Sequence, residues 1–191
     1  MIIDNVSTIR SIRLFNCCNE LNIINYPLTN YQFILASIHL TTFIAAPAER
    51  VFDLSRSINL HQISTATTYE RAIAGVVTGL INENETVTWQ AKHLFKTRQF
   101  TSRITTMKKP IHFIDEMIKG DFKSFRHEHH FKSVENGTIM IDQVNFESPY
   151  GVIGKWVNNI YLKNYLENLL TSRNNTIKEY AETEKWKAIL N

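Results

Sequence analysis

The chain has 191 residues, of which 43% are hydrophobic and 20% are charged, and a chain of this length can bury a sizeable core in one domain. Its formal net charge of +3, with no lysine- or arginine-rich run, excludes the usual electrostatic signature of a nucleic-acid-binding protein. Its two cysteines, Cys17 and Cys18, are adjacent, which excludes a disulfide framework and favours a reducing, cytoplasmic compartment.

The sequence predicts neither a membrane span nor a secretion signal. The best apolar candidate, residues 33–46, is interrupted by Ser37, His39, Thr41 and Thr42, whereas a membrane-spanning helix needs about 20 predominantly apolar residues. The first residues lack the basic start, apolar centre and small-residue cleavage site of a signal peptide. We therefore expect no stable insertion into a membrane.

The patterned part of the chain begins near residue 38. Residues 1–37 are rich in asparagine and isoleucine and keep neither a strand nor a helix period, so we expect a poorly ordered extension that the functional protein does not require. Residues 38–44 alternate and are rich in β-branched side chains, which predicts a strand. Two short helices are predicted next, at residues 48–55 after Pro47 and at residues 58–64.

A series of alternating segments follows and predicts an antiparallel meander. We expect its strands at residues 78–81, 86–94, 99–106, 111–119, 122–133 and 138–148. Asn136-Gly137 between two such segments is a strong hairpin signal. Gly120 is expected to provide the positive φ of another tight turn.

From residue 152 to residue 182 the apolar period changes from 2 to 3.6, which predicts one long helix followed by a tail at residues 183–191. This helix is the only element large enough to cover one face of the meander. We therefore predict an α+β domain over residues 38–182, in which a curved antiparallel sheet of about seven strands wraps a long C-terminal helix.

Three stretches carry a resemblance to a known family. They are Ile44-Ala-Ala-Pro-Ala-Glu-Arg-Val-Phe-Asp-Leu54, Val87-Thr-Trp-Gln-Ala-Lys-His93 and the segment 115–129. Together they resemble the START/polyketide-cyclase-like helix-grip superfamily, also called SRPBCC, and within it the bacterial ligand-binding subgroup and the coenzyme-Q-binding START-like relatives. The resemblance implies a helix-grip fold with an internal cavity for a hydrophobic ligand. It implies neither a cofactor nor one particular reaction.

Strand alternation places a mixed set of side chains on the concave face of the sheet. With two residues of the long helix, we predict that the cavity is lined by Trp89, His93, Phe113, Asp115, Met117, Phe125, His127, His129, Phe131, Asp142, Val144, Tyr165 and Leu169.

The polar members of this set are His93, Asp115, His127, His129 and Asp142, and they admit four interpretations. They orient an otherwise apolar ligand, or a His–Asp pair acts as a general base. Alternatively the two histidines of the strand bind a metal ion with a third ligand, or the groups are satisfied polar residues of the core. No cysteine or glutamate completes a known metal-ligand spacing, so we expect no metal.

The favoured hypothesis is binding, and through it transport or sequestration, of a hydrophobic molecule such as a lipid, an isoprenoid or quinone, or a polyketide-like compound. The alternative is a cyclase/aromatase-like enzyme that uses a His–Asp pair in the cavity, although nothing in the sequence requires catalysis. A third hypothesis is a partner-interaction domain that uses the apolar ridge near residues 150–157. The oligomeric state is left open.

Overall fold

The computed structural model describes residues 36–93, 96–148 and 155–190, apart from the side chains of His93 and of residues 155–160. The predicted extension, residues 1–37, therefore lies outside the described residues except for Ala36 and Ser37, which begin the first strand.

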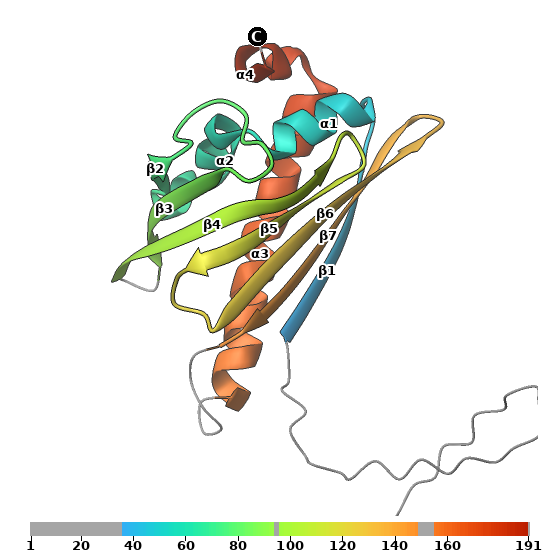
Figure 1. The fold of residues 1–191 in the computed structure, drawn as a ribbon. Coiled ribbons are helices and arrows are strands. Elements are labelled where there is room, and N and C mark those ends of the chain that lie inside the picture. Colours follow the sequence, from blue (N-terminus) through green and yellow to red (C-terminus); the bar gives the residue numbers. More distant parts are fainter. Residues whose placement is uncertain (1–35, 94–95, 149–154, 191) are drawn as a thin grey trace, which may run out of the picture. The chain divides into compact units, whose positions relative to one another are not determined.

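Within the described residues, seven antiparallel strands form one curved sheet (Figure 1). The strands are β1 (Ala36–Ile44), β2 (Arg71–Gly75), β3 (Thr86–His93), β4 (Lys96–Lys108), β5 (His112–Lys119), β6 (Ser124–Val134) and β7 (Gly137–Glu147). Their order across the sheet is β1-β7-β6-β5-β4-β3-β2. Sequential neighbours therefore pair from β2 to β7, as the predicted antiparallel meander requires. In addition, β1 pairs with β7 and forms the other edge of the sheet.

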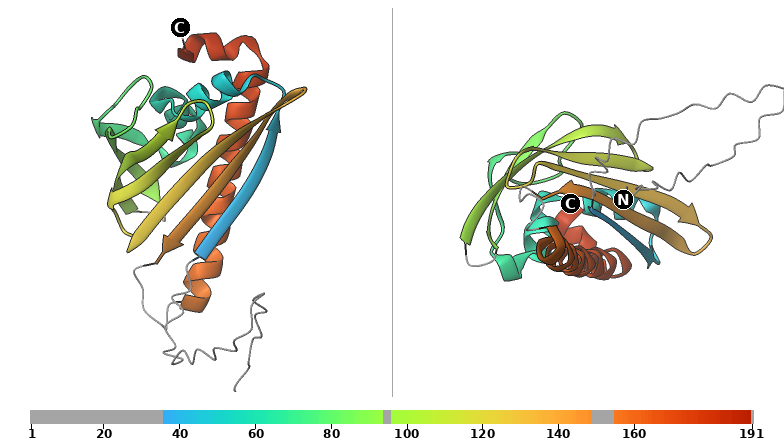
Figure 2. Two further views of the ribbon diagram at one scale, coloured as in Figure 1. Left: turned by 45° about the vertical axis from the view of Figure 1, so that its right-hand side comes forward. Right: turned by 90° about the horizontal axis from the view of Figure 1, so that it is seen from below.

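The long helix α3 (Lys155–Glu182) crosses the concave side of the sheet, where it packs against β1 and against the two short helices (Figure 2). These are α1 (Ala48–Ser55) and α2 (Ile58–Ser64), and both have the predicted bounds. A short 3-10 turn, η1 (Ala66–Thr68), leads from α2 to β2. The predicted α+β helix-grip architecture is confirmed. Among the described residues, no helix is long and apolar enough to cross a bilayer.

The β6–β7 hairpin depends on its glycine. Val134 pairs with Gly137, so the connection contains only Glu135 and Asn136. Gly137 has a φ of +155°, and a Cβ atom there would lie 2.2 Å from the carbonyl oxygen of Ile44. Any other residue would push the end of β1 away from the hairpin.

The prediction for Gly120 was wrong, because Gly120 is not among the described glycines with a positive φ. The pairing of β5 with β6 ends at Glu116 and Arg126, while β5 continues along β4 as far as Lys119. The two strands separate before they are connected, so no tight turn is needed.

The prediction of a short strand at residues 78–81 was also wrong. The strand in this region is β2, and Leu80 makes only an isolated bridge with Ser57. The amide of Ile58 donates to the carbonyl of Gly79 at 2.9 Å. These contacts hold the segment against the start of α2 instead of the sheet.

The segment after α3, predicted as a tail, contains the 3-10 turn η2 (Glu184–Trp186) and the short helix α4 (Lys187–Leu190). Trp186, Ile189 and Leu190 pack, partly buried, against the main core. The guanidinium of Arg50 lies 4.5 Å from the centre of a Trp186 ring, which is a cation–π distance.

Buried apolar residues form two clusters. The larger one lies where α1, α2 and the second half of α3 meet the sheet, and includes Phe52, Ile104, Phe131, Met140 and Ile177. The smaller one lies towards the first half of α3, with Ile38, Val144 and Phe146 buried and Phe122, Phe125, Leu162, Leu166 and Leu170 packed around them. Polar side chains of β5, β6, β7 and α3 lie between the two clusters.

Candidate functional site

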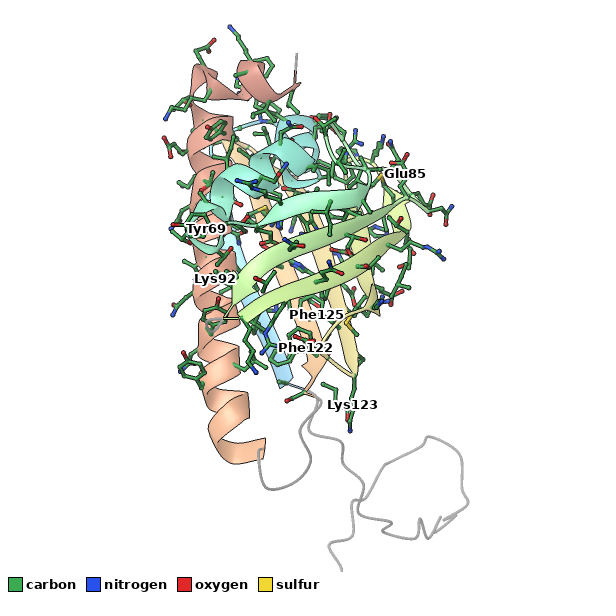
Figure 3. The ribbon with its side chains drawn as sticks, turned by 90° about the vertical axis from the view of Figure 1, so that its left-hand side faces the viewer. Tyr69, Glu85, Lys92, Phe122, Lys123 and Phe125 are labelled. Carbon is green, nitrogen blue, oxygen red and sulfur yellow. The ribbon has the colours of Figure 1, made fainter. Side chains whose placement is uncertain are left out.

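A cavity of about 500 Å³ lies between the concave face of the sheet and the helices α2 and α3. Its walls are mostly aromatic and aliphatic, and include Ile58, Val87, Trp89, Phe100, Ile104, Phe113, Phe122, Phe125, Val144, Leu162, Leu166, Leu169 and Leu170. Figure 3 shows Phe122 and Phe125 side by side at the end of the sheet away from α1. The side chain of Lys123, which lies between them in the sequence, points outwards. The cavity reaches the surface at this end, where exposed Tyr161 and the ion pair of Arg98 with Asp121 form part of its wall.

The structure places most of the predicted cavity residues in this wall. They are Trp89, Phe113, Asp115, Phe125, His127, His129, Val144, Tyr165 and Leu169. Whether they bind a ligand stays a prediction.

Three predicted residues lie elsewhere, and the His93 side chain falls outside the described part of the chain. Phe131 is buried in the larger cluster, where its ring meets Phe52 edge-on at 5.2 Å between centroids. Met117 lies against Gly120, at the connection of β5 with β6. Asp142 is fully buried behind the cavity wall, in contact with His127.

Asp142 is the centre of a buried hydrogen-bond network. Its Oδ1 lies 2.9 Å from Nε2 of His127 in a hydrogen bond. Nδ1 of His129 is also 2.9 Å from Oδ1, although its angle does not meet hydrogen-bond geometry. On the other side, Nδ2 of Asn174 donates to Oδ2 at 2.7 Å, and Nη1 of Arg173 lies 3.7 Å from Oδ1. Both carboxylate oxygens therefore have partners, from β6 and from α3.

The surroundings of Asp142 favour its charged form. Burial alone would raise the pKa of this carboxyl, but the contacts from His127 and His129 outweigh burial, and the pKa lies well below its ordinary value. Burial, with the neighbouring charge of His127, lowers the pKa of His129 well below the usual histidine value. The network therefore favours an ionised Asp142 beside a neutral His129.

Arg173 is buried with this network, and burial lowers the pKa of its guanidinium, an effect that Asp142 opposes. Its Nη2 donates to the carbonyl of Ser55 at 2.7 Å, at the end of α1. The guanidinium thus ties α3 to α1 and to β7 at one point.

Asp115 lies on the neighbouring strand β5 in a different environment. It faces His127 across the β5–β6 pairing, and its carboxyl is buried in the cavity wall, so that burial raises its pKa despite a partial opposing effect of Ser102. Neither Oδ1 of Asp115 nor Oγ of Ser102 has an aligned hydrogen-bond partner among the described residues.

A third polar position lies where α2 meets β3. His61 stacks on Trp89 with 4.1 Å between ring centroids, and its Nε2 lies 3.4 Å from Oε1 of Glu70. Tyr165 of α3 also lines this part of the cavity, and burial together with nearby Tyr161 and Glu70 raises its pKa. Polar groups therefore line the cavity on several of its walls.

His127, His129 and Asp142 present ligand-type atoms within 4.8 Å of one another, which is the metal set that the sequence left open. The chemistry of this set fits a hydrogen-bond network better than a cation site. The charge of Asp142 is already opposed by Arg173, and Oδ2 accepts a hydrogen bond from Asn174. A divalent cation would have to share this space with a guanidinium.

Sequence reasoning missed Arg173 and Asn174. A signal was present, because Arg173 follows Leu169 by four residues and Leu170 by three, which places it on the same helix face. His61 was also missed, since nothing in a seven-residue helix indicates which side chain reaches a distant strand.

No family model and no curated protein sequence matches the chain. Its fold is nevertheless similar to solved structures. It superposes on the Zhui aromatase/cyclase from a Streptomyces species with a TM-score of 0.62 and 12% identity, covering 78% of this chain and 94% of that one. A START superfamily protein from Mycobacterium smegmatis gives 0.58 and 13%, with coverages of 75% and 97%. The ginseng major latex-like protein 151 from Panax ginseng gives 0.58 and 12%, with coverages of 78% and 99%.

These neighbours are START, polyketide-cyclase-like and related SRPBCC proteins. The likeness covers three quarters of this chain and nearly the whole of each neighbour. At identities this low it establishes the fold, and the helix-grip fold suggested by the sequence motifs is confirmed.

Proposed function

We propose that this protein binds a small to medium-sized hydrophobic molecule in the cavity between α3 and the sheet. The observation that carries the proposal is the cavity itself, whose volume of about 500 Å³ is typical of small-molecule sites. Its mostly apolar wall with a few polar positions fits a lipid, an isoprenoid or quinone, or a polyketide-like compound. Binding of this kind serves transport or sequestration.

The proposed binding domain covers residues 36–190, which extends the sequence-based bounds at both ends because β1 begins at Ala36 and α4 packs on the core. We place the protein in the cytoplasm, since its two cysteines offer no disulfide framework. No nucleic-acid partner and no stable membrane insertion belong to this proposal.

The direct experiment is gentle mass spectrometry of the protein purified from its own host, in which we expect a co-purifying apolar molecule. A binding assay with the fluorescent probe N-phenyl-1-naphthylamine complements it. Leu166→Trp puts an indole into the cavity and should weaken probe binding at least about tenfold, because the neighbouring side chains can make room for the probe only by adopting strained conformations. Ser172→Trp, at an exposed position of the same helix, is the matched control. Equal binding by both variants would contradict the proposal.

A second candidate function rests on the geometry of His127. Its Nε2 contacts Asp142, which lies behind the wall, while the His127 ring itself lines the cavity. When Nε2 donates to the carboxylate, the other ring nitrogen carries the lone pair. A carboxylate-oriented imidazole of this kind can act as a general base towards an enolisable carbonyl compound, as a cyclase/aromatase-like reaction requires.

His127→Phe separates the two candidates. If His127 only orients the ligand, the variant should keep apolar probe binding. If His127 is a base, the wild type should exchange the α-protons of a bound aryl 1,3-diketone for deuterium, measured by NMR, and the variant should lose that exchange. Exchange at the same rate in both proteins would remove the enzymatic candidate.

A further inference from the structure

Asp115 presents a partly buried carboxyl to the cavity. Its Oδ1 has almost no accessible surface and no aligned hydrogen bond with a described residue, whereas the side chain as a whole is partly exposed in the cavity wall. Asp115 forms no ion pair within the described part of the chain. A buried polar atom that stays unpaired costs about 1–3 kcal/mol. A carboxyl that lines a binding cavity and has no aligned partner in the protein therefore indicates a group that the ligand, or water in its absence, supplies to its accessible oxygen.

The neighbouring charged and titratable groups do not satisfy Asp115, because they have other partners. His127, opposite Asp115 on β6, bonds to Asp142. Arg173 from α3 donates to Ser55 and lies beside Asp142. His61 from α2 stacks on Trp89. Each of these three groups influences Asp115 only through space.

The protonation of Asp115 matters for what it recognises. Burial raises the pKa of its carboxyl, so the neutral acid is favoured more than in water. A neutral carboxyl both donates and accepts hydrogen bonds. The hydroxyl of Ser102 on β4 is buried and is not part of the cavity wall; it lies close enough to the carboxyl to lower the pKa of Asp115, which partly opposes the effect of burial.

We propose that the ligand carries an uncharged hydroxyl group, alcoholic or phenolic, which pairs with Asp115 while its apolar body lies among Phe122, Phe125 and Leu166. This inference rests on the proposed function and specifies the class of ligand. The hydroxyl reproduces the donor and acceptor role of a water molecule at Asp115, and so takes its place without leaving the accessible side of the carboxyl unpaired.

A charged head group fits less well. A ligand carboxylate would come close to the Asp115 carboxyl, and the guanidinium of Arg173 that could offset its charge is already engaged. A ligand ammonium would require Asp115 to ionise in the buried wall, against the effect of burial on its pKa. A purely apolar ligand would leave the accessible side of the Asp115 carboxyl without a hydrogen-bond partner.

The test compares two probes of equal shape, 2-naphthol and 2-methylnaphthalene, by competition with the fluorescent probe N-phenyl-1-naphthylamine. The measured quantity is the ratio of their Kd values, because the two compounds differ in their own hydrophobicity. Asp115→Leu should shift this ratio about tenfold in favour of 2-methylnaphthalene, the size expected for one lost hydrogen bond. Asp115→Asn, which keeps a donor and an acceptor, should shift it less than about threefold.

Glu116→Gln is the matched control, because Glu116 follows Asp115 on β5, points to the opposite face and pairs with Arg126. It should leave the ratio unchanged. 2-Naphthoate and 2-naphthylmethylamine serve as charged arms, and stronger binding of either than of 2-naphthol would overturn the hydroxyl assignment. A ratio unchanged by Asp115→Leu would also overturn it, and would mean that Asp115 holds only water.

If the proposed hydrophobic-ligand binding itself is wrong, none of these compounds should bind to the wild type. This result differs from a failure of the hydroxyl assignment alone, in which the compounds bind but the ratio of their Kd values is unchanged. The assignment does not depend on the variants folding. In wild-type protein labelled at the aspartate side-chain carbons, 2-naphthol should shift the ¹³C resonance of the Asp115 carboxyl more than 2-methylnaphthalene does. Equal shifts with both compounds would contradict the proposal.

Discussion

Two carboxyls on the concave face of the same sheet, Asp142 fully buried and Asp115 partly exposed in the cavity wall, meet opposite environments. Asp142 on β7 has partners at both oxygens, from His127 and Asn174, with Arg173 nearby. Asp115 on β5 has an unpaired Oδ1 in the cavity wall. Surroundings lower the pKa of Asp142 and raise that of Asp115.

The difference between their surroundings suggests that Asp142 and Asp115 have different roles. A carboxylate whose bonds are all made within the protein holds elements together, here β6 and β7 to α3. A carboxyl without an aligned partner in the protein can form its hydrogen bond with another molecule, and this bond offsets the free-energy cost of removing the carboxyl from water. We propose that Asp142 on β7 has the structural role and Asp115 on β5 the ligand-facing role.

The largest expected effect follows from removing the charge of Asp142. Asp142→Asn leaves Arg173 buried without its counter-charge, and should lower the free energy of unfolding by about 3–5 kcal/mol. Chemical denaturation measures this loss. Asp121→Asn, at an exposed surface ion pair, should cost no more than about 1 kcal/mol. A similar small loss for both variants would show that the Asp142 network does not organise the fold.

The second effect is a dependence of stability on pH that His129 introduces. The folded state lowers the pKa of His129, so the unfolded chain takes up a proton more readily, and stability should fall as the pH drops from about 7 to about 5. His129→Phe should flatten this decline, measured by thermal unfolding at a series of pH values. An equally steep decline in the variant would assign the dependence to other groups.

The third prediction is an increase in stability instead of a loss. Asp115→Leu removes an unpaired carboxyl and should raise the stability of the ligand-free protein by about 1 kcal/mol at neutral pH. The folded state raises the pKa of Asp115, so its contribution to stability is lost as the pH rises through the folded-state pKa. The gain from the substitution should therefore shrink as the pH falls towards 4. A destabilising result at pH 7 would mean that Asp115 is satisfied within the protein.

The smallest effect concerns metal binding. Since Arg173 opposes a cation beside Asp142, addition of excess zinc should shift the Tm by less than about 1 °C. A large, saturable increase that disappears in His129→Phe would instead show that His127, His129 and Asp142 form a metal site.

Strand periodicity predicted several residues of the cavity wall, but it also put Met117, Phe131 and Asp142 there, and these lie elsewhere. Alternation put His127, His129, Asp142 and Val144 on one face, and these side chains are buried on that face. The Asn136-Gly137 signal and the bounds of α1 and α2 were likewise readable from local sequence. Segments held by distant contacts were not: the stretch at residues 78–81 is fixed by Ser57 and Ile58, and the residues after 182 by the core.

The sequence by itself determined that Asp115 and Asp142 share a face, because a strand's period is a local property. Only the tertiary structure decided that one is satisfied and the other is not. Helix α3 lies against β1, the neighbour of β7, so Arg173 and Asn174 reach Asp142, whereas a cavity separates the wall at β5 from the helix. The separation between β5 and α3 depends on how strongly the sheet curves around the helix. This curvature results from small contributions of many residues, so it cannot be predicted from one motif.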